Sequence, residues 1–162
     1  MSKIKDLLKD DNSVLVFDID GVLAVMEFGE YNHFYGKSDD EWLQASDHGM
    51  NLYTEDKVSN KIKTFIEFKD KTRVYVVTKI RTDSEGKYKK AFAHKYYHIP
   101  LENIYIIDRN LEKTEALIEI KKKYPELDDK YLIMIDDTVK NLNEIMENTN
   151  FSTAHISTLL DM

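Results

Sequence analysis

The chain of 162 residues contains no cysteine, only two prolines and only five glycines. The absence of cysteine excludes disulfide bonds, thiolate zinc sites and cysteine nucleophiles, and it is typical of a reducing compartment. The scarcity of proline and glycine argues against long linkers or disordered tracts. No apolar run is long enough to cross a bilayer, and the first residues, MSKIKD, lack the apolar core of a signal peptide. We therefore expect a cytoplasmic protein that does not insert into a membrane.

The remaining composition is that of a globular protein, with 42% hydrophobic and 33% charged residues. This length suits one domain with a sizeable core, so we expect a single domain over residues 1–162. The formal net charge of −7 disfavours general binding to nucleic acid, because the phosphate backbone would be repelled. It leaves open a small phosphorylated substrate in a locally positive pocket.

Short apolar runs alternate with helix-length amphipathic stretches along the chain. The predicted strands are residues 13–18, 73–78, 103–107, 131–136 and 152–156, all nearly continuous in apolar character. Such runs are typical of a parallel sheet that is buried on both faces. The predicted helices are residues 2–9, 58–69, 84–97, 113–123 and 139–147, with Asp56 and Asp83 as N-cap candidates for the second and third. The pattern predicts an α/β fold with a doubly wound parallel sheet.

One segment, residues 24–57, interrupts this alternation between the first strand and the next helix. It is rich in aromatic residues: Phe28, Tyr31, Phe34, Tyr35, Trp42 and Tyr53. Long insertions in compact domains are often lids or binding loops. We expect a short flap here, and two roles remain open: contact with substrate, or packing of the aromatic side chains back onto the domain.

The sequence FDIDGVL at residues 17–23 follows the apolar run of the first strand. Alternate side chains of an extended backbone point the same way, so Asp18 and Asp20 are expected to converge on one spot. Two like charges so close repel each other unless a cation or a proton lies between them. Gly21 permits the sharp turn that aims both acids at one point. This arrangement favours phosphoryl transfer, with Asp18 as nucleophile and Asp20 as general acid and base.

Three further groups of polar residues follow predicted strands or open helices. Thr78 ends the second strand and offers a hydroxyl and an amide to a phosphate oxygen, while Lys79 adds positive charge. Lys113 opens a helix, where a structural choice would more often be acidic, and Arg109 is its competitor as the active-site cation.

Two adjacent acids, Asp136 and Asp137, close the fourth strand, and Asn141 follows four residues later. Adjacent side chains in a strand diverge, so only one of these two acids is expected to bind a metal directly. His94 and His98 share a helix face but lack a third ligand nearby, so we interpret them as surface or packing residues.

In this order the motifs resemble those of the haloacid dehalogenase (HAD) superfamily of phosphohydrolases, over nearly the whole chain. The resemblance implies a Rossmann-like HAD core and an aspartyl-phosphate intermediate. It also implies Lys113 as the lysine that neutralises nucleophile and phosphate, and Mg²⁺ held by Asp18, Asp137, Asp136 and the backbone carbonyl of Asp20. Asp137 matches the usual ligand and is preferred, with Asp136 second or acting through water. Thr78 matches the family's Thr or Ser after the second strand, whereas Lys79 departs from the small or polar residue expected next; we expect Thr78, Lys79 and Gly21 around the substrate. Hard oxygen ligands without sulfur favour Mg²⁺ as well.

The expected function is therefore Mg²⁺-dependent hydrolysis of a phosphate monoester by a minimally capped HAD enzyme. A phosphorylated small molecule is the expected substrate, while a bulky phosphorylated substrate and a homo-oligomer remain open. The alternatives are a phosphotransferase on the same core and a non-catalytic module that binds phosphate or a partner.

Overall fold

The computed structural model describes residues 3–25, 40–41, 43–44 and 48–162. Five parallel strands form one sheet in the order β3-β2-β1-β4-β5. The strands are β1 (Val14–Phe17), β2 (Val74–Ile80), β3 (Ile104–Asp108), β4 (Leu132–Asp136) and β5 (Ser152–His155). The predicted doubly wound parallel sheet is therefore confirmed, and each observed strand starts within one residue of its predicted start.

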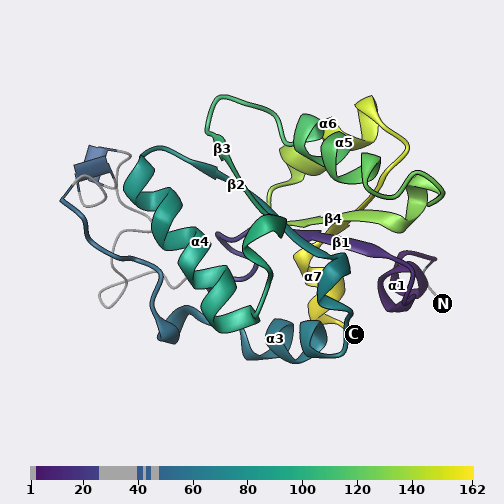
Figure 1. Cartoon of the computed structure of the whole chain (residues 1–162), viewed down its shortest axis with the longest axis horizontal. Helices are drawn as coiled ribbons and strands as arrows, with labels where there is room; N and C mark the ends of the chain where they lie inside the picture. Colours follow the sequence, from purple (N-terminus) through teal and green to yellow (C-terminus); the bar gives the residue numbers. More distant parts are fainter. Residues whose placement is uncertain (1–2, 26–39, 42, 45–47) are drawn as a thin grey trace.

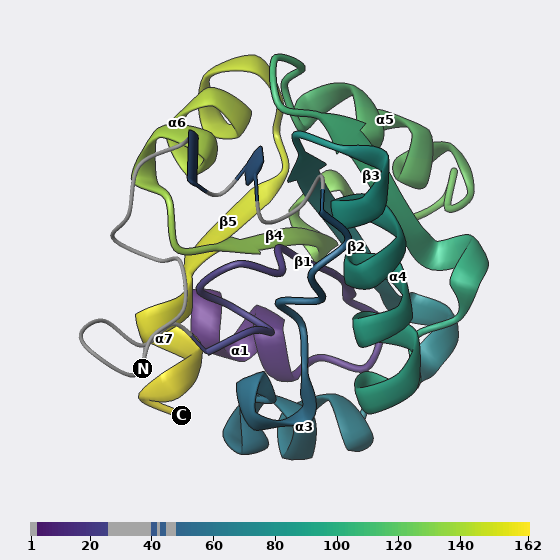
Figure 2. The same cartoon turned by 90° about the vertical axis from the view of Figure 1, so that its left-hand side faces the viewer.

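The helices cover both faces of this sheet (Figures 1 and 2). They are α1 (Lys3–Lys9), α3 (Asn60–Glu67), α4 (Asp83–Tyr97), α5 (Thr114–Lys122), α6 (Val139–Asn148) and α7 (Ile156–Leu160). The helices α5 and α6 lie on one face, and α1, α3, α4 and α7 lie on the other. Four single 3-10 turns accompany these helices: Glu55–Lys57, Lys71–Arg73, Leu101–Asn103 and Asp129–Tyr131.

The alternation of side chains along each strand divides the core into two layers. In β1, Leu15 and Phe17 pack with α3 and α4, whereas Val14 and Val16 pack with α5 and α6. All four side chains are fully buried, which explains why the strand reads as a continuous apolar run. Burial of both faces fixes the register of β1 between β2 and β4, because a slip of one residue would exchange the two layers.

The helix caps differ from the prediction. Ser59, not Asp56, caps α3 by accepting a hydrogen bond from the Ile62 amide, and Asp56 lies in the preceding 3-10 turn. Thr82, not Asp83, caps α4 and accepts from the Glu85 amide. Hydroxyl groups serve as well as carboxylates at this position, so the capping residue differs by three positions for α3 and by one for α4 although both helices form as predicted.

The insertion of residues 24–57 is described only in part. Residues 26–39, 42 and 45–47, including Phe28, Tyr31, Phe34, Tyr35 and Trp42, lie outside the described residues. The described end of the insertion returns to the core, where Leu52 and Tyr53 are buried. A backbone hydrogen bond of 2.7 Å from the Val25 amide to the Lys57 carbonyl ties its two ends together.

Candidate active site

Asp18 follows β1 directly and lies at the carboxyl edge of the sheet. Its amide donates to the Ile135 carbonyl at 3.0 Å, which holds it beside the end of β4, where Asp136 stands. The carboxyl ends of neighbouring parallel strands meet at one edge, and ligands of such sheets bind there. Two acids that are distant in sequence are therefore adjacent in space.

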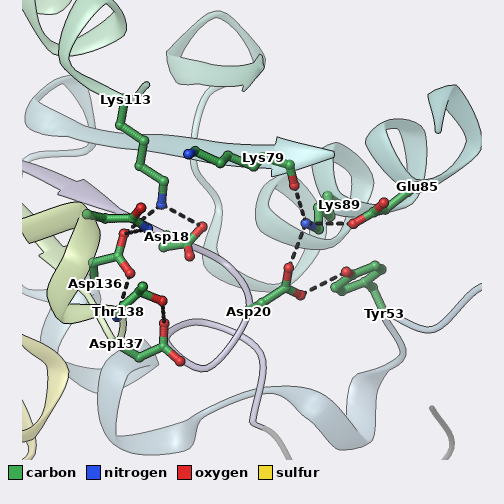
Figure 3. A network of polar contacts seen from close by, with 11 residues as sticks. Asp18, Asp20, Tyr53, Lys79, Glu85, Lys89, Lys113, Asp136, Asp137 and Thr138 are labelled. Atoms are coloured by element: carbon green, nitrogen blue, oxygen red, sulfur yellow. Dashed lines mark hydrogen bonds and ion pairs between the residues drawn. The ribbon is translucent and has the colours of Figure 1, made fainter. Parts of the chain in front are cut away.

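Lys113 joins these two acids. It stands at the amino end of α5, and its ammonium group lies 3.1 Å from Asp18 and 2.7 Å from Asp136 (Figure 3). The lysine side chain is only 1% exposed. Burial alone would lower the pKa of Lys113, but the charges of Asp18 and Asp136 outweigh burial and raise it. The geometry thus favours Lys113 over Arg109 as the cation beside Asp18.

Asp136 is fully buried and accepts hydrogen bonds from three donors. One oxygen accepts from the Thr138 amide at 2.8 Å, and the other accepts from the Asn141 side chain at 3.0 Å as well as from Lys113. These contacts orient Asp136 and leave it few lone pairs for another ligand. Asn141, the polar residue that follows Asp136 and Asp137 in the sequence, thus helps to orient the carboxylate of Asp136.

Asp137 completes a group of three carboxylates with Asp18 and Asp136. One oxygen of each lies within 4.8 Å of the others, a spacing that suits one divalent cation. Asp137 is exposed, and one of its oxygens accepts from the Thr138 hydroxyl at 3.1 Å. Since the oxygens of Asp136 are engaged, Asp18 and Asp137 are better placed to bind a metal directly. The residues present therefore fit Mg²⁺.

The charge of this group is unbalanced within the described chain. Burial raises the pKa of Asp18, and repulsion from Asp136 and Asp20 adds to this effect against the attraction of Lys113. Burial, with repulsion from Asp136 and Asp18, raises the pKa of Asp137 to about 6. One lysine thus stands among three carboxylates, and a divalent cation would supply the missing positive charge.

Gly21 forms the turn against this acidic group. Its φ is +74°, a left-handed conformation that glycine adopts without strain. A Cβ atom on residue 21 would lie 2.2 Å from a carboxylate oxygen of Asp137. The position therefore needs glycine for its backbone conformation and also for the space that Asp137 occupies.

Asp20 belongs to a second network, apart from the three carboxylates. The backbone leaves the extended conformation at Ile19, so the alternation that predicts convergence of Asp18 and Asp20 ends with the strand. One oxygen of Asp20 lies 2.6 Å from the ammonium of Lys89, and the other accepts from the Tyr53 hydroxyl at 2.8 Å. Figure 3 shows the carboxylate directed toward these two groups and away from Lys113. The predicted convergence is corrected accordingly.

Lys89 is the centre of this second network and is missed by sequence reasoning. It is 1% exposed, pairs with Glu85 at 2.8 Å and donates to the Lys79 carbonyl at 2.6 Å. Glu85 in turn accepts from the Arg81 amide at 2.9 Å. Burial would lower the pKa of Lys89, but Asp20 and Glu85 outweigh burial and raise it. The one signal in the sequence is the i, i+4 spacing of Glu85 and Lys89, which is common on exposed helices.

Thr78 lies where the sequence predicts, in β2 beside β1. Its side chain is fully buried, and its hydroxyl has no hydrogen-bond partner among the described residues. An unpaired buried hydroxyl costs folding free energy, so its presence at the carboxyl half of β2 suggests a use other than stability. Lys79 follows in the same strand and is half-buried.

The two histidines of α4 do not form a site. His94 contacts the Ile99 carbonyl at 2.9 Å, and His98 caps the helix with a φ of 56°. Both are exposed, in agreement with their interpretation as surface residues.

Within the described chain, every helix is too short or too polar to span a membrane.

Comparisons with known proteins give structural neighbours only. No protein-family model and no curated protein matches the sequence. The structure of DsGPDH of Dunaliella salina matches 94% of this chain and 25% of its own, at 16% identity and a TM-score of 0.56. This chain therefore spans about a quarter of that protein's length.

Two structures of the HAD domain of effector protein Lem4 from Legionella pneumophila also match. The first has 16% sequence identity and a TM-score of 0.47, and the match covers 88% of this chain and 84% of that chain. The second, an inactive mutant, has 14% sequence identity and a TM-score of 0.48, and the match covers 90% of this chain and 86% of that chain. With its parallel sheet in the order β3-β2-β1-β4-β5 and its acids at the carboxyl ends of β1 and β4, the chain has a Rossmann-like α/β fold, which it shares with part of the Dunaliella protein.

Proposed function

We propose that this protein is a Mg²⁺-dependent phosphatase that hydrolyses a phosphate monoester through an aspartyl-phosphate. The observation that carries the proposal is the contact of buried Lys113 with both Asp18 and Asp136, beside a third carboxylate. A carboxylate attacks a dianionic phosphate only if cations offset the repulsion between them. Lys113 supplies one such cation at a fixed position.

In the first step, Asp20 leaves Lys89 and takes up a proton from solvent, a carboxylate oxygen of Asp18 attacks phosphorus, the bond to the alcohol oxygen breaks, and Asp20 protonates that oxygen. In the second step, Asp20 takes a proton from water, whose oxygen attacks phosphorus and releases inorganic phosphate and the free carboxylate of Asp18. The buried hydroxyl of Thr78 donates to a phosphate oxygen in both steps. In the structure, the carboxylate of Asp20 contacts Lys89 and Tyr53, so the Asp20 side chain must rotate away from them to reach the substrate.

Asp18 and Asp137 are the residues that would hold Mg²⁺, with Asp136 in support. When bound, the ion supplies charge neutralisation for the carboxylates and the phosphate. The substrate we propose is a phosphorylated small molecule, since the net charge of −7 disfavours polyanions in general.

The proposal is tested by phosphate release from 4-nitrophenyl phosphate and a panel of phosphorylated metabolites, with Mg²⁺ and with EDTA. Wild type is compared with Asp18→Asn, and Asp11→Asn, at an exposed position, is the matched control. We expect release that requires Mg²⁺, persists in the control and falls at least a thousandfold in Asp18→Asn. Release that survives Asp18→Asn would contradict the nucleophile. Absence of release from every compound, with the fold intact, would favour a binding role.

A further inference from the structure

A cavity of about 280 Å³ lies beside Asp20 at the carboxyl ends of β2 and β3. The residues that line it are Asp20, Lys79, Ile80, Arg81, Glu85 and Arg109. A hydrogen bond of 2.9 Å from the Arg109 amide to the Ile80 carbonyl joins the two strand ends, so the wall of the cavity rests on the sheet. Of the residues that line the cavity, only Asp20 has a role in the proposed reaction steps. The cavity's three cationic side chains, Lys79, Arg81 and Arg109, have none.

The wall of this cavity carries more positive than negative charge. Lys79, Arg81 and Arg109 contribute three cations, while the two acids, Asp20 and Glu85, both contact the buried ammonium of Lys89. No ion pair within the described residues holds Lys79 or Arg109. In a chain of net charge −7, a locally positive cavity points to an anionic ligand.

Asp20 relates this cavity to the reaction. It protonates the oxygen of the departing alcohol in the proposed mechanism, and it borders the cavity in the position from which it turns toward the substrate. The alcohol half of the substrate therefore leaves toward the side on which the cavity lies. An alcohol that carries its own negative charge would place that charge beside Lys79 and Arg109. Arginine side chains suit this role, because the guanidinium fork binds carboxylate or phosphate with two parallel hydrogen bonds.

We propose that this cavity binds a second anionic group, a carboxylate or a phosphate, carried by the alcohol half of the substrate. The inference rests on the proposed function and names its substrate class: phosphate monoesters of acidic alcohols. Specificity then comes from paired charges at the ends of β2 and β3.

The test compares aryl phosphates that differ in one substituent. The 3- and 4-carboxyphenyl phosphates carry an anion, the corresponding carbamoylphenyl phosphates are neutral and of the same size, and 1,4-phenylene bisphosphate carries a second phosphate. We expect kcat/KM for the best anionic ester to exceed that of its neutral partner by about tenfold, as for one charge-assisted hydrogen-bonded contact. In Arg109→Gln this ratio should fall to between one and three. Lys87→Gln, an exposed lysine of α4 outside the cavity, removes the same charge and should keep the ratio.

The outcomes separate the two proposals. Turnover of all esters without preference for the anionic ones overturns the cavity assignment and leaves the phosphatase intact. If no ester is hydrolysed, the phosphatase proposal fails, and calorimetric binding of 4-carboxybenzylphosphonate against 4-carbamoylbenzylphosphonate decides the cavity. If the carboxylate compound binds about ten times more tightly than the carbamoyl compound, and Arg109→Gln weakens its binding, the cavity assignment is supported. Equal affinities of the two compounds overturn it. Preference for the carboxylate or for the second phosphate identifies which anion the cavity takes.

Discussion

The buried ammonium group of Lys89 and the carboxylate of Asp20 form an ion pair at 2.6 Å. Lys89 also binds Glu85 and the Lys79 carbonyl, so it ties the loop after β1 to the end of β2 and to α4. Lys89 thereby sets the starting position of the group that we propose as proton donor, without touching substrate itself. It is a positioning residue.

The role of Lys89 predicts a dependence on the leaving group. In Lys89→Met, kcat should fall about tenfold further for ethyl phosphate than for 4-nitrophenyl phosphate, because ethoxide needs a proton to leave and 4-nitrophenolate does not. Loss of Lys89 leaves Glu85 buried and unpaired, so the double variant Lys89→Met/Glu85→Gln is measured beside it to keep the fold stable. Equal losses on both esters would assign Lys89 a purely structural role.

Removal of the Thr78 hydroxyl should affect stability and activity in opposite directions. Thr78→Val removes a buried hydroxyl that has no partner in the described chain and keeps the side-chain shape. The free energy of unfolding should stay the same or rise by up to about 1 kcal/mol, while kcat/KM falls tenfold or more. Urea denaturation and phosphate release measure the two quantities. Thr78→Ser, which keeps the hydroxyl, should retain most of the activity, and its inactivity would count against a role for the hydroxyl.

Gly21 and Gly49 provide a matched pair of substitutions. Both have a φ of 74°, but a Cβ would meet Asp137 at 2.2 Å from residue 21 and only the Tyr88 hydroxyl, at 3.8 Å, from residue 49. Gly49→Ala should therefore cost about 1 kcal/mol from backbone strain alone. Gly21→Ala should cost more and should also reduce the rise in melting temperature on addition of Mg²⁺. Equal melting behaviour of the two variants, with and without Mg²⁺, would refute the role of the Asp137 contact.

Tyr97 predicts a loss of stability at alkaline pH. Its hydroxyl donates to the Leu23 carbonyl and accepts from the Ser59 amide at 2.8 Å, and burial raises its pKa above the ordinary value of 10.0. The folded state therefore keeps the proton that the unfolded chain releases above about pH 10, so this contribution to stability is complete below pH 10 and is lost as pH rises. The slope is about 1.4 kcal/mol per pH unit for one such group.

The measurement for Tyr97 is urea denaturation of wild type and Tyr97→Phe at pH 8, 10 and 11. The free energy of unfolding of wild type should decline more steeply above pH 10 than that of the variant. Tyr75, whose pKa burial also raises, remains in both proteins and therefore cancels in the comparison. Parallel declines would show that Tyr97 titrates alike in the folded and unfolded states.

The sheet and half of the site could be predicted because local patterns determine them. Val14 and Val16 face one layer and Leu15 and Phe17 the other, so a run buried on both sides is apolar throughout and recognisable in the sequence. Asp18, Lys113 and Asp136 follow strands or open a helix, and parallel topology gathers such positions at one edge.

The second network could not be predicted because it depends on tertiary contacts. Lys89 is one of several lysines on α4, and only the packing of that helix against β2 and the loop after β1 buries it. Asp20 lies beyond the end of the strand, where alternation no longer decides the direction of a side chain. The five-residue helix α7 follows β5 without a turn and is too short for helical periodicity to reveal.

The placement of β1 at the centre of the sheet has a consequence for how the protein is made. β1 pairs with β2 and β4, and Asp18 meets Lys113 and Asp136 only after α5 and β4 have been synthesised and have docked. A ribosome-bound chain that ends before β4 contains Lys113 but lacks Asp136, so its central strand has one open edge and its lysine lacks one of its two carboxylate partners. If the proposed function holds, the site is complete only when that edge closes, so the appearance of phosphatase activity during synthesis would report completion of the sheet.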